Sequence, residues 1–218
     1  MVMAVVTMHD KTYEYLYPLT WNQNGLLYCE AWGYRHFILD YPGDIPHGFA
    51  KIRYLIEVCE QNPDVEWIFW KDCDGLITNF NIRIEDVVDN DYHVILTTHN
   101  NGINNGMMFV RNSPEGRDYL RMIFSHMPQY IHGPGVEQAV MVDTHDANRH
   151  LIKIVPQRTF NAVPYSDFSY GRITSRLDTL GTEGHWKEGD FVMHWPGEAH
   201  HERLRICNIY LPRVIPKT

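Results

Sequence analysis

The sequence predicts a single α/β domain, residues 1–218, with a central and mostly parallel sheet flanked by helices. In the first half of the chain, short apolar runs alternate with amphipathic stretches of helical length, which is typical of parallel strands joined by crossover helices. With 218 residues, 44% of them hydrophobic and 21% charged, the chain is long enough for one substantial core. The sequence contains no repeat, linker or low-complexity segment, so we expect no division into smaller domains.

Strands and helices alternate through the first half of the chain. The expected strands are 3–8, 34–40 and 65–70, and the expected helices are 13–32 and 49–61. Pro18 is tolerated near a helix start, and Gly33 is suited to a helix end. In the second helix, Ile52, Leu55 and Ile56 recur at the spacing of a buried helical face. The strand at 65–70 reads VEWIFW and is apolar enough to be buried.

The second half of the chain has a less regular pattern. The expected strands are 92–98, 107–111, 151–155 and 191–194, and the expected helices are 114–127 and 135–142. Between the first two strands we expect a loop, HNNGINNG, because Asn and Gly favour tight turns. Pro114 is suited to the first turn of its helix. The last twelve residues, CNIYLPRVIPKT, give no clear assignment.

Charge and apolar pattern limit the possible partners. The formal net charge of -8 and the pI near 5.9 disfavour a nucleic-acid-binding protein, because phosphate-binding surfaces are rich in Lys and Arg. The opening VMAVVTM is too short for a transmembrane segment and lacks the pattern of a signal peptide, so we expect a soluble, cytoplasmic protein. The four cysteines show no C-x-x-C pairing, which favours reduced thiols.

The most informative segment is VEWIFWKDCDG, a buried strand that ends in two carboxylates, Asp72 and Asp74. Residues i and i+2 of a strand share a face, so both carboxylates can converge on one cation, while Cys73 is expected on the opposite face. Mg²⁺ and Mn²⁺ prefer hard oxygen ligands and often bind together with a phosphate-bearing substrate. The alternative is a solvated turn that contains two acidic residues.

Five parts of the sequence together resemble a known family. They are YCEAWGY (28–34), AKIRYL (50–55), WIFWKDCDGLITN (67–79), NNGMMFVRNS (104–113) with Glu137 and Gln138, and VPQRTFNAVP (155–164) followed by GDFVMHWPG (189–197). This set resembles glycosyltransferase family 34, the galactosyl, mannosyl and xylosyl transferases of fungal mannan and plant xyloglucan synthesis. The resemblance implies a GT-A type, Rossmann-like fold. It also implies transfer of a hexose or pentose from a nucleotide-diphosphate sugar, UDP-linked in our expectation, to a saccharide or other hydroxyl acceptor.

The resemblance also implies roles for residues around the acidic motif. Asp72 and Asp74 would contact the metal, Mn²⁺ or Mg²⁺, with Asp74 the more direct ligand, and His194 would be the third ligand. Imidazole is a suitable ligand for Mn²⁺. Lys51 would contact the nucleotide or the phosphates of the donor, although a solvated position on a helix face explains it equally well. By analogy of fold, Thr7 at the end of the first strand would face the nucleotide.

The remaining implied roles concern the sugar. Asn104 and Asn105 resemble the loop that faces the sugar and acceptor, and Gln138 would lie close to the reacting face of the sugar. Members of the family transfer with retention of configuration. Because a neutral amide is a poor nucleophile, we favour a front-face transfer in which Gln138 orients or stabilises the sugar and the departing diphosphate takes the proton of the acceptor. Trp195 and Tyr165 are candidates for stacking on sugars.

Two other functions remain open from the sequence. An apolar strand that ends in D-x-D-G is also the nucleophile motif of haloacid-dehalogenase-like, Mg²⁺-dependent phosphatases. The sequence shows no later lysine and no paired acidic segment where such a phosphatase needs them, and the motif follows the third strand rather than the first. The other alternative is a non-catalytic module that binds a sugar or nucleotide.

Overall fold

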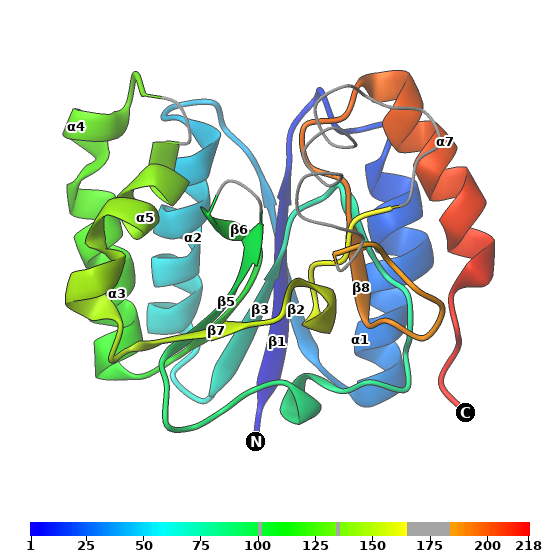
Figure 1. Ribbon diagram of the computed structural model, residues 1–218, viewed down its shortest axis with the longest axis horizontal. Coiled ribbons are helices and arrows are strands. Elements are labelled where there is room, and N and C mark those ends of the chain that lie inside the picture. The colour runs from blue at the N-terminus through cyan, green and yellow to red at the C-terminus, as the bar shows by residue number, and fades with distance from the viewer. Residues whose placement is uncertain (100–101, 134–135, 165–183) are drawn as a thin grey trace.

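The computed structural model describes residues 1–99, 102–133, 136–164 and 184–218. Its main sheet has six strands in the order β2-β1-β3-β6-β5-β7 (Figure 1). The strands are β1 Met3–His9, β2 Arg35–Asp40, β3 Trp67–Lys71, β5 Val94–His99, β6 Gly102–Arg111 and β7 Ile152–Val155. β1 is parallel to β2 and β3, and β5 is parallel to β7, whereas β6 is antiparallel to both β3 and β5. Five strands therefore point the same way, which confirms the prediction of a mostly parallel sheet.

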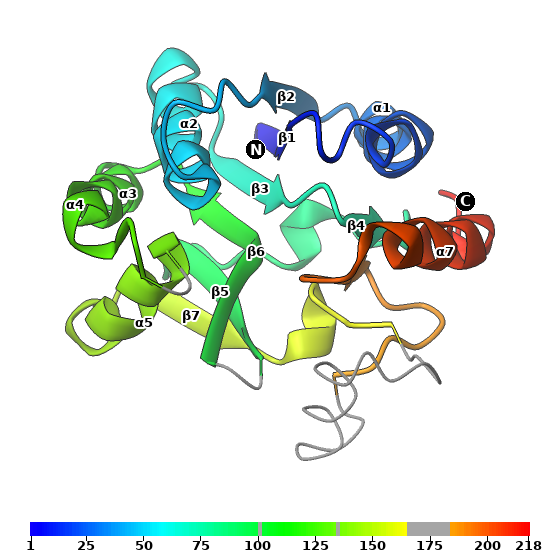
Figure 2. The ribbon, with the colours of Figure 1, turned by 90° about the horizontal axis from the view of Figure 1, so that it is seen from above.

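Helices cover both faces of this sheet. The α-helices are α1 Leu26–Trp32, α2 His47–Gln61, α3 Pro114–Ser125, α4 Met127–Tyr130, α5 Val136–Asn148 and α7 His200–Tyr210. A π-helix, η1 Pro18–Gly25, precedes α1, and there are short 3-10 helices at η2 Ile84–Asp86, η3 Gln157–Thr159 and η4 Leu211–Arg213. Figures 1 and 2 show α2, α3, α4 and α5 on one side of the sheet and α1 and α7 on the other. No helix among the described residues is both long and apolar enough to cross a bilayer.

The alternation of side chains along each strand produces two separate cores. On β1, Ala4 and Val6 pack into a core with α2, α3 and α5, whereas Met3 and Val5 pack into a second core with α1. The same alternation continues along β3, β5 and β6, because successive residues of a strand point to opposite faces. The sheet is therefore packed on both faces.

Two predicted boundaries are wrong. The predicted helix at 13–32 is helical only from about Pro18, because a proline fits the first turn of a helix and the residues before it form turns. The residues Asn104, Asn105 and Gly106, predicted to lie in a loop, belong to β6. Pairing with β5 and β3 extends this strand beyond its apolar part, with Thr97 opposite Asn104 and Lys71 opposite Met107.

A second, two-stranded sheet lies beyond the end of β3. It consists of β4 Gly75–Ile77 and β8 Val192–His194, which are antiparallel and pair Gly75 with His194. The sequence predicted β8 but neither β4 nor α7, which covers this small sheet through Ile206 and Cys207. All four cysteines are free thiols, as predicted. The small sheet places the end of β8 directly beside the residues that follow β3.

Candidate active site

A cavity of about 340 Å³ opens where β3 ends and β6 begins. Its lining includes most of the predicted site residues, namely Lys51, Asp72, Asp74, Asn104, Asn105, Gln138 and His194. Thr7 is buried and is not among the lining residues, whereas its neighbour Met8 is. Trp195 is fully buried, and Tyr165 lies outside the described residues.

The three predicted metal ligands converge in this cavity. One ligand atom from each of Asp72, Asp74 and His194 lies within 4.8 Å of the others. Strand alternation is not the cause, because both aspartates follow the last residue of β3, and Asp74 lies in a turn. The pairing of β4 with β8 brings His194 to the turn. Cys73, expected on the opposite face, also lines the cavity.

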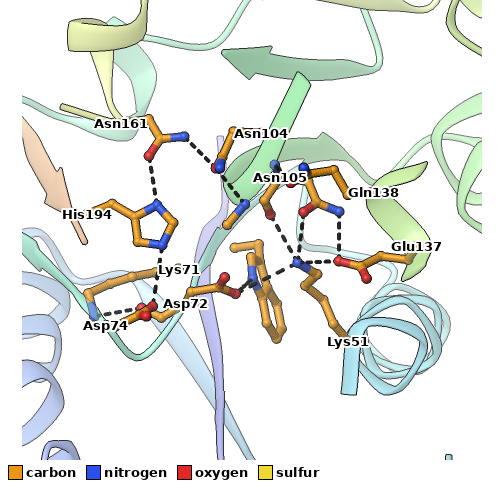
Figure 3. Close-up of polar contacts among 12 residues, drawn as sticks. Lys51, Lys71, Asp72, Asp74, Asn104, Asn105, Glu137, Gln138, Asn161 and His194 are labelled. Atoms are coloured by element: carbon orange, nitrogen blue, oxygen red, sulfur yellow. Dashed lines mark hydrogen bonds and ion pairs between the residues drawn. The ribbon is translucent and has the colours of Figure 1, made fainter. Parts of the chain in front are cut away.

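The two ring nitrogens of His194 face Asn161 on one side and Asp74 on the other (Figure 3). Nδ1 lies 2.9 Å from the side-chain oxygen of Asn161. Nε2 is buried without a hydrogen-bond partner, and it lies 3.3 Å from Oδ1 of Asp74. A buried nitrogen that faces two carboxylates and lacks a partner has the surroundings of a metal ligand whose other nitrogen is fixed by the protein.

The carboxylate of Asp72 is fixed in a similar way. Its Oδ1 accepts a hydrogen bond of 2.6 Å from Nε1 of Trp70 and lies 3.8 Å from Nζ of Lys51. Its Oδ2 faces Gly106, where an added Cβ would lie only 2.8 Å from this oxygen. Burial raises the pKa of Asp72 above its usual range, and the charge of Lys51 offsets this effect only in part. One oxygen is therefore anchored and the other is left for a ligand.

Arg203 on α7 lies beside the carboxylate of Asp74, as Lys51 lies beside that of Asp72. Its Nε lies 3.7 Å from Oδ2 of Asp74, on the oxygen that does not face His194. Burial would raise the pKa of Asp74, but the adjacent His194 ring and the charge of Arg203 hold this pKa below its usual range. The guanidinium also lies over the ring of Tyr13, 4.4 Å from its centroid. Asp74 is therefore the carboxylate that stays ionised most readily.

Lys51 is buried, so the alternative of a solvated helix face is wrong. Its Nζ lies 2.9 Å from Oε1 of Glu137 and donates to the backbone oxygen and to Oδ1 of Asn105, both at 3.2 Å. Burial alone would lower the pKa of Lys51, but Asp72 and Glu137 together raise it. The ammonium group therefore remains charged and connects α2, β6 and α5 at the wall of the cavity (Figure 3).

The two remaining predicted residues lie on neighbouring elements. Gln138, on α5, lines the cavity, and its Oε1 accepts a hydrogen bond of 3.4 Å from the backbone N–H of Asn105. Asn104 uses its Oδ1 within the protein, because this oxygen accepts from the N–H of Gly106 at 3.1 Å and from Nδ2 of Asn161 at 2.8 Å. Among the described residues, no hydrogen bond from its side-chain nitrogen is found.

Two residues that contact the proposed metal ligands from outside the cavity lining, Asn161 and Arg203, were not predicted. Asn161 lies in VPQRTFNAVP, a segment that contributed to the resemblance, but nothing in its local sequence indicated a role. Arg203 lies in a helix that was itself missed, so no signal pointed to it. Both act from elements that only the tertiary fold brings to the cavity.

Comparison with known proteins identifies the family. The sequence profile of the galactosyl transferase GMA12/MNN10 family matches residues 1–91 and 88–202. The chain belongs to glycosyltransferase family 34. This agrees with the resemblance that the acidic motif and its companion segments indicated.

Curated relatives of this family 34 chain come from Schizosaccharomyces pombe. An uncharacterized alpha-1,2-galactosyltransferase is 26% identical over 215 residues, which cover 78% of this chain and 53% of that protein. A second alpha-1,2-galactosyltransferase is 25% identical over 213 residues, with the same two coverages. The chain therefore spans about half the length of the curated relatives that it matches.

Solved structures establish the fold. A glycosyltransferase involved in the glycosylation of the major capsid of PBCV-1 matches with a TM-score of 0.70 at 16% identity, over 96% of this chain and all of that one. The galactosyltransferase LgtC, solved with donor and acceptor sugar analogs, matches with a TM-score of 0.58 at 14% identity, over 97% and 96% of the two chains. The fold is of the GT-A type, as predicted.

Proposed function

We propose that this family 34 chain is a metal-dependent, retaining glycosyltransferase. In this proposal it moves a hexose or pentose from a UDP-linked donor to a hydroxyl group of a saccharide acceptor. The observation that carries the proposal is the convergence of Asp72, Asp74 and His194 within 4.8 Å in a cavity that also contains Gln138. The names of the relatives, alpha-1,2-galactosyltransferases, support the class of reaction.

The donor set fits Mn²⁺ or Mg²⁺. Two carboxylates and one imidazole suit Mn²⁺ well, and the buried, unpartnered Nε2 of His194 is a group that an ion would satisfy. When bound, such an ion supplies Lewis-acid stabilisation of the negative charge that develops on a departing diphosphate. Lys51 provides a fixed positive charge on the same wall of the cavity, because Glu137 and Asn105 hold its ammonium group in place.

The carboxylates of the cavity support a front-face transfer. Glu137 is the carboxylate next to Gln138, but its Oε1 already contacts Lys51 at 2.9 Å and accepts from Nδ2 of Asn105 at 2.9 Å. These bonds make it a poor nucleophile. In the proposed step, the acceptor oxygen bonds to the anomeric carbon while the bond from that carbon to the diphosphate oxygen breaks, and the acceptor proton passes to the departing phosphate. Gln138 would orient the sugar through its amide.

The test asks whether the purified chain transfers sugar from a nucleotide-sugar donor to a saccharide. UDP-linked and GDP-linked sugars are incubated with Mn²⁺ and a panel of saccharides, and release of the nucleoside diphosphate is measured together with the configuration of the product by NMR. We expect Mn²⁺-dependent release with a UDP-linked donor and a retained configuration. Asp74→Asn is expected to remove most activity, whereas Asp118→Asn, on an exposed side chain, should leave it unchanged.

Three results would contradict the proposal. Wild-type rates in Asp74→Asn with Mn²⁺ would exclude the assigned ligand. Turnover of p-nitrophenyl phosphate would favour a phosphatase. Tight binding of UDP without any turnover would favour a non-catalytic binding module. Because the matched family consists of glycosyltransferases, we expect none of these outcomes.

A further inference from the structure

A chain of hydrogen bonds leads from the backbone of β6 to His194. It begins at the N–H of Gly106, which donates to Oδ1 of Asn104 at 3.1 Å. Nδ2 of Asn161 donates to the same oxygen at 2.8 Å and also to Oγ1 of Thr97 at 2.8 Å. The other end of the Asn161 amide, Oδ1, lies 2.9 Å from Nδ1 of His194. Figure 3 shows the contacts that link Asn104, Asn161 and His194.

The first bond of this chain has a fixed direction. A side-chain amide can be turned over to exchange its oxygen and nitrogen, but a backbone N–H can only donate. The atom of Asn104 next to Gly106 must therefore be the oxygen. An oxygen accepts only, so the atom of Asn161 that faces it must be nitrogen. The opposite atom of Asn161 is then an oxygen, and Nδ1 of His194 must donate to it.

The direction of this chain determines which nitrogen of His194 keeps a proton. Because Nδ1 donates to Asn161, the nitrogen that can give up its proton and offer a lone pair is Nε2. Nε2 is the buried, unpartnered atom that lies 3.3 Å from Oδ1 of Asp74. When a metal takes the lone pair of Nε2, the proton that remains on the ring is therefore the one on Nδ1, on the side away from the aspartates.

The surroundings of Asn161 keep this arrangement rigid. Asn161 is almost completely buried, and its segment is bonded to β8, since the N–H of His194 donates to the backbone oxygen of Ala162 at 2.7 Å. The His194 ring also packs against Gly106, where an added Cβ would lie 2.3 Å from Cε1. The ring can neither turn nor move away without disturbing β6 and β8.

We propose that Asn161 is a positioning residue that holds the proton of His194 on Nδ1, so that Nε2 is presented as a metal ligand. This inference rests on the proposed function, because it assigns a purpose to a ligand of the proposed metal site. Besides any contact with a sugar, Asn104 then has a structural role, because its Oδ1 orients the amide of Asn161. Without an acceptor at Asn161, the carboxylate of Asp74 would compete for the ring proton on Nε2, where it would oppose metal binding.

The first measurement is NMR of the ring nitrogens of His194 in protein labelled with ¹⁵N-histidine. The chain has 13 histidines, so His194→Gln is used to identify the signal. In the wild-type protein with Mg²⁺, we expect a slowly exchanging proton on Nδ1 and none on Nε2. A proton on Nε2 in this state would overturn the inference.

The second measurement is Mn²⁺ affinity, followed by EPR with Mn²⁺ alone. Asn161→Leu keeps the size of the side chain but removes the acceptor, and we expect affinity to fall about 10–100-fold. Asn161→Asp keeps an acceptor beside Nδ1, but its second oxygen replaces the Nδ2 donor that faces Oδ1 of Asn104, so we expect a Mn²⁺ affinity between those of Asn161→Leu and the wild type. Thr97→Val removes the other partner of the amide nitrogen and serves as the matched control, with affinity close to the wild type.

Each outcome decides the inference. Wild-type Mn²⁺ affinity together with a retained Nδ1 proton in Asn161→Leu would show that Asn161 has no such role. Equal losses in Asn161→Leu, Asn161→Asp and Thr97→Val would indicate a general packing role and would also overturn it. If Asn161→Leu does not fold, the wild-type NMR result decides. None of these readouts requires sugar transfer, so a failure of the proposed function remains distinguishable.

Discussion

Gly106→Ala should remove metal binding while leaving the chemistry of every proposed ligand intact. A Cβ at this position would lie 2.8 Å from Oδ2 of Asp72 and 2.9 Å from Nε2 of His194. Ions of this kind bind their ligands at about 2.0–2.2 Å, so the methyl group would stand in the space where an ion between these two atoms must lie. We expect the affinity for Mn²⁺ to fall at least about 100-fold.

This loss converts into a measurable change in thermal stability. A ligand at about 100 times its Kd stabilises the folded state by about 2.7 kcal/mol, and after a 100-fold loss of affinity the same concentration contributes only about 0.4 kcal/mol. For a chain of 218 residues, about 1 kcal/mol shifts the Tm by about 2–4 °C. The Mn²⁺-dependent rise in Tm should therefore fall from about 5–11 °C to about 1–2 °C. The metal-free variant should lose about 1–3 kcal/mol through overpacking.

The assay is a thermal-shift titration with Mn²⁺ on the wild type and on Gly106→Ala. Gly133→Ala is the matched control, because among the described residues its added Cβ would meet only the backbone oxygen of Tyr130, at 3.6 Å. The control should keep the full rise in Tm. A full rise in Gly106→Ala would refute the reasoning, since the proposed ion could then not lie between Asp72 and His194.

Two further predictions concern buried charges. Glu137→Gln removes a carboxylate partner of the buried Lys51 and should lower the free energy of unfolding, measured in urea, by about 3–5 kcal/mol. Glu60→Gln, in a half-exposed pair with Arg121, is the control and should cost less than about 1 kcal/mol. Similar costs in the two variants would contradict the argument from burial. Burial and the neighbouring Glu202 raise the pKa of Glu198 from 4.5 to about 7, although Arg203 and Arg205 oppose this shift. The folded chain therefore holds this proton more tightly than the unfolded chain, so its contribution to stability is lost as the pH rises from about 4.5 to about 7. Glu198→Gln should be more stable than the wild type by about 1–3 kcal/mol in urea at about pH 8 and equal to it at about pH 4, and a constant difference at both pH values would contradict the assignment.

The sequence predicted the parts of the site that depend on local pattern. An apolar strand followed by D-x-D indicates the end of β3 from local pattern, whereas His194 was predicted only through the family resemblance that GDFVMHWPG helps to carry. The burial of Lys51 could not be found, because a lysine on a helix face is buried only if a distant carboxylate meets it. Glu137, on α5, is that carboxylate. Arg203 was missed for the same reason, since its partner Asp74 lies on a different part of the chain.

The antiparallel direction of β6 explains how Asn104 and Gly106, predicted to lie in a loop, reach the site from a strand. In open α/β sheets, ligands lie beyond the carboxyl ends of the parallel strands, and the end of β3 follows this rule. β6 is antiparallel to β3, with Met107 opposite Lys71, so its first residues rather than its last reach the same edge. Asn104 and Gly106 could not approach Asp72 and His194 if β6 ran parallel, because its start would then lie at the far edge of the sheet. The cavity therefore depends on the antiparallel direction of β6. This strand supplies the side-chain amide of Asn104, the backbone N–H of Gly106 and, because Gly106 has no side chain, the space between Asp72 and His194.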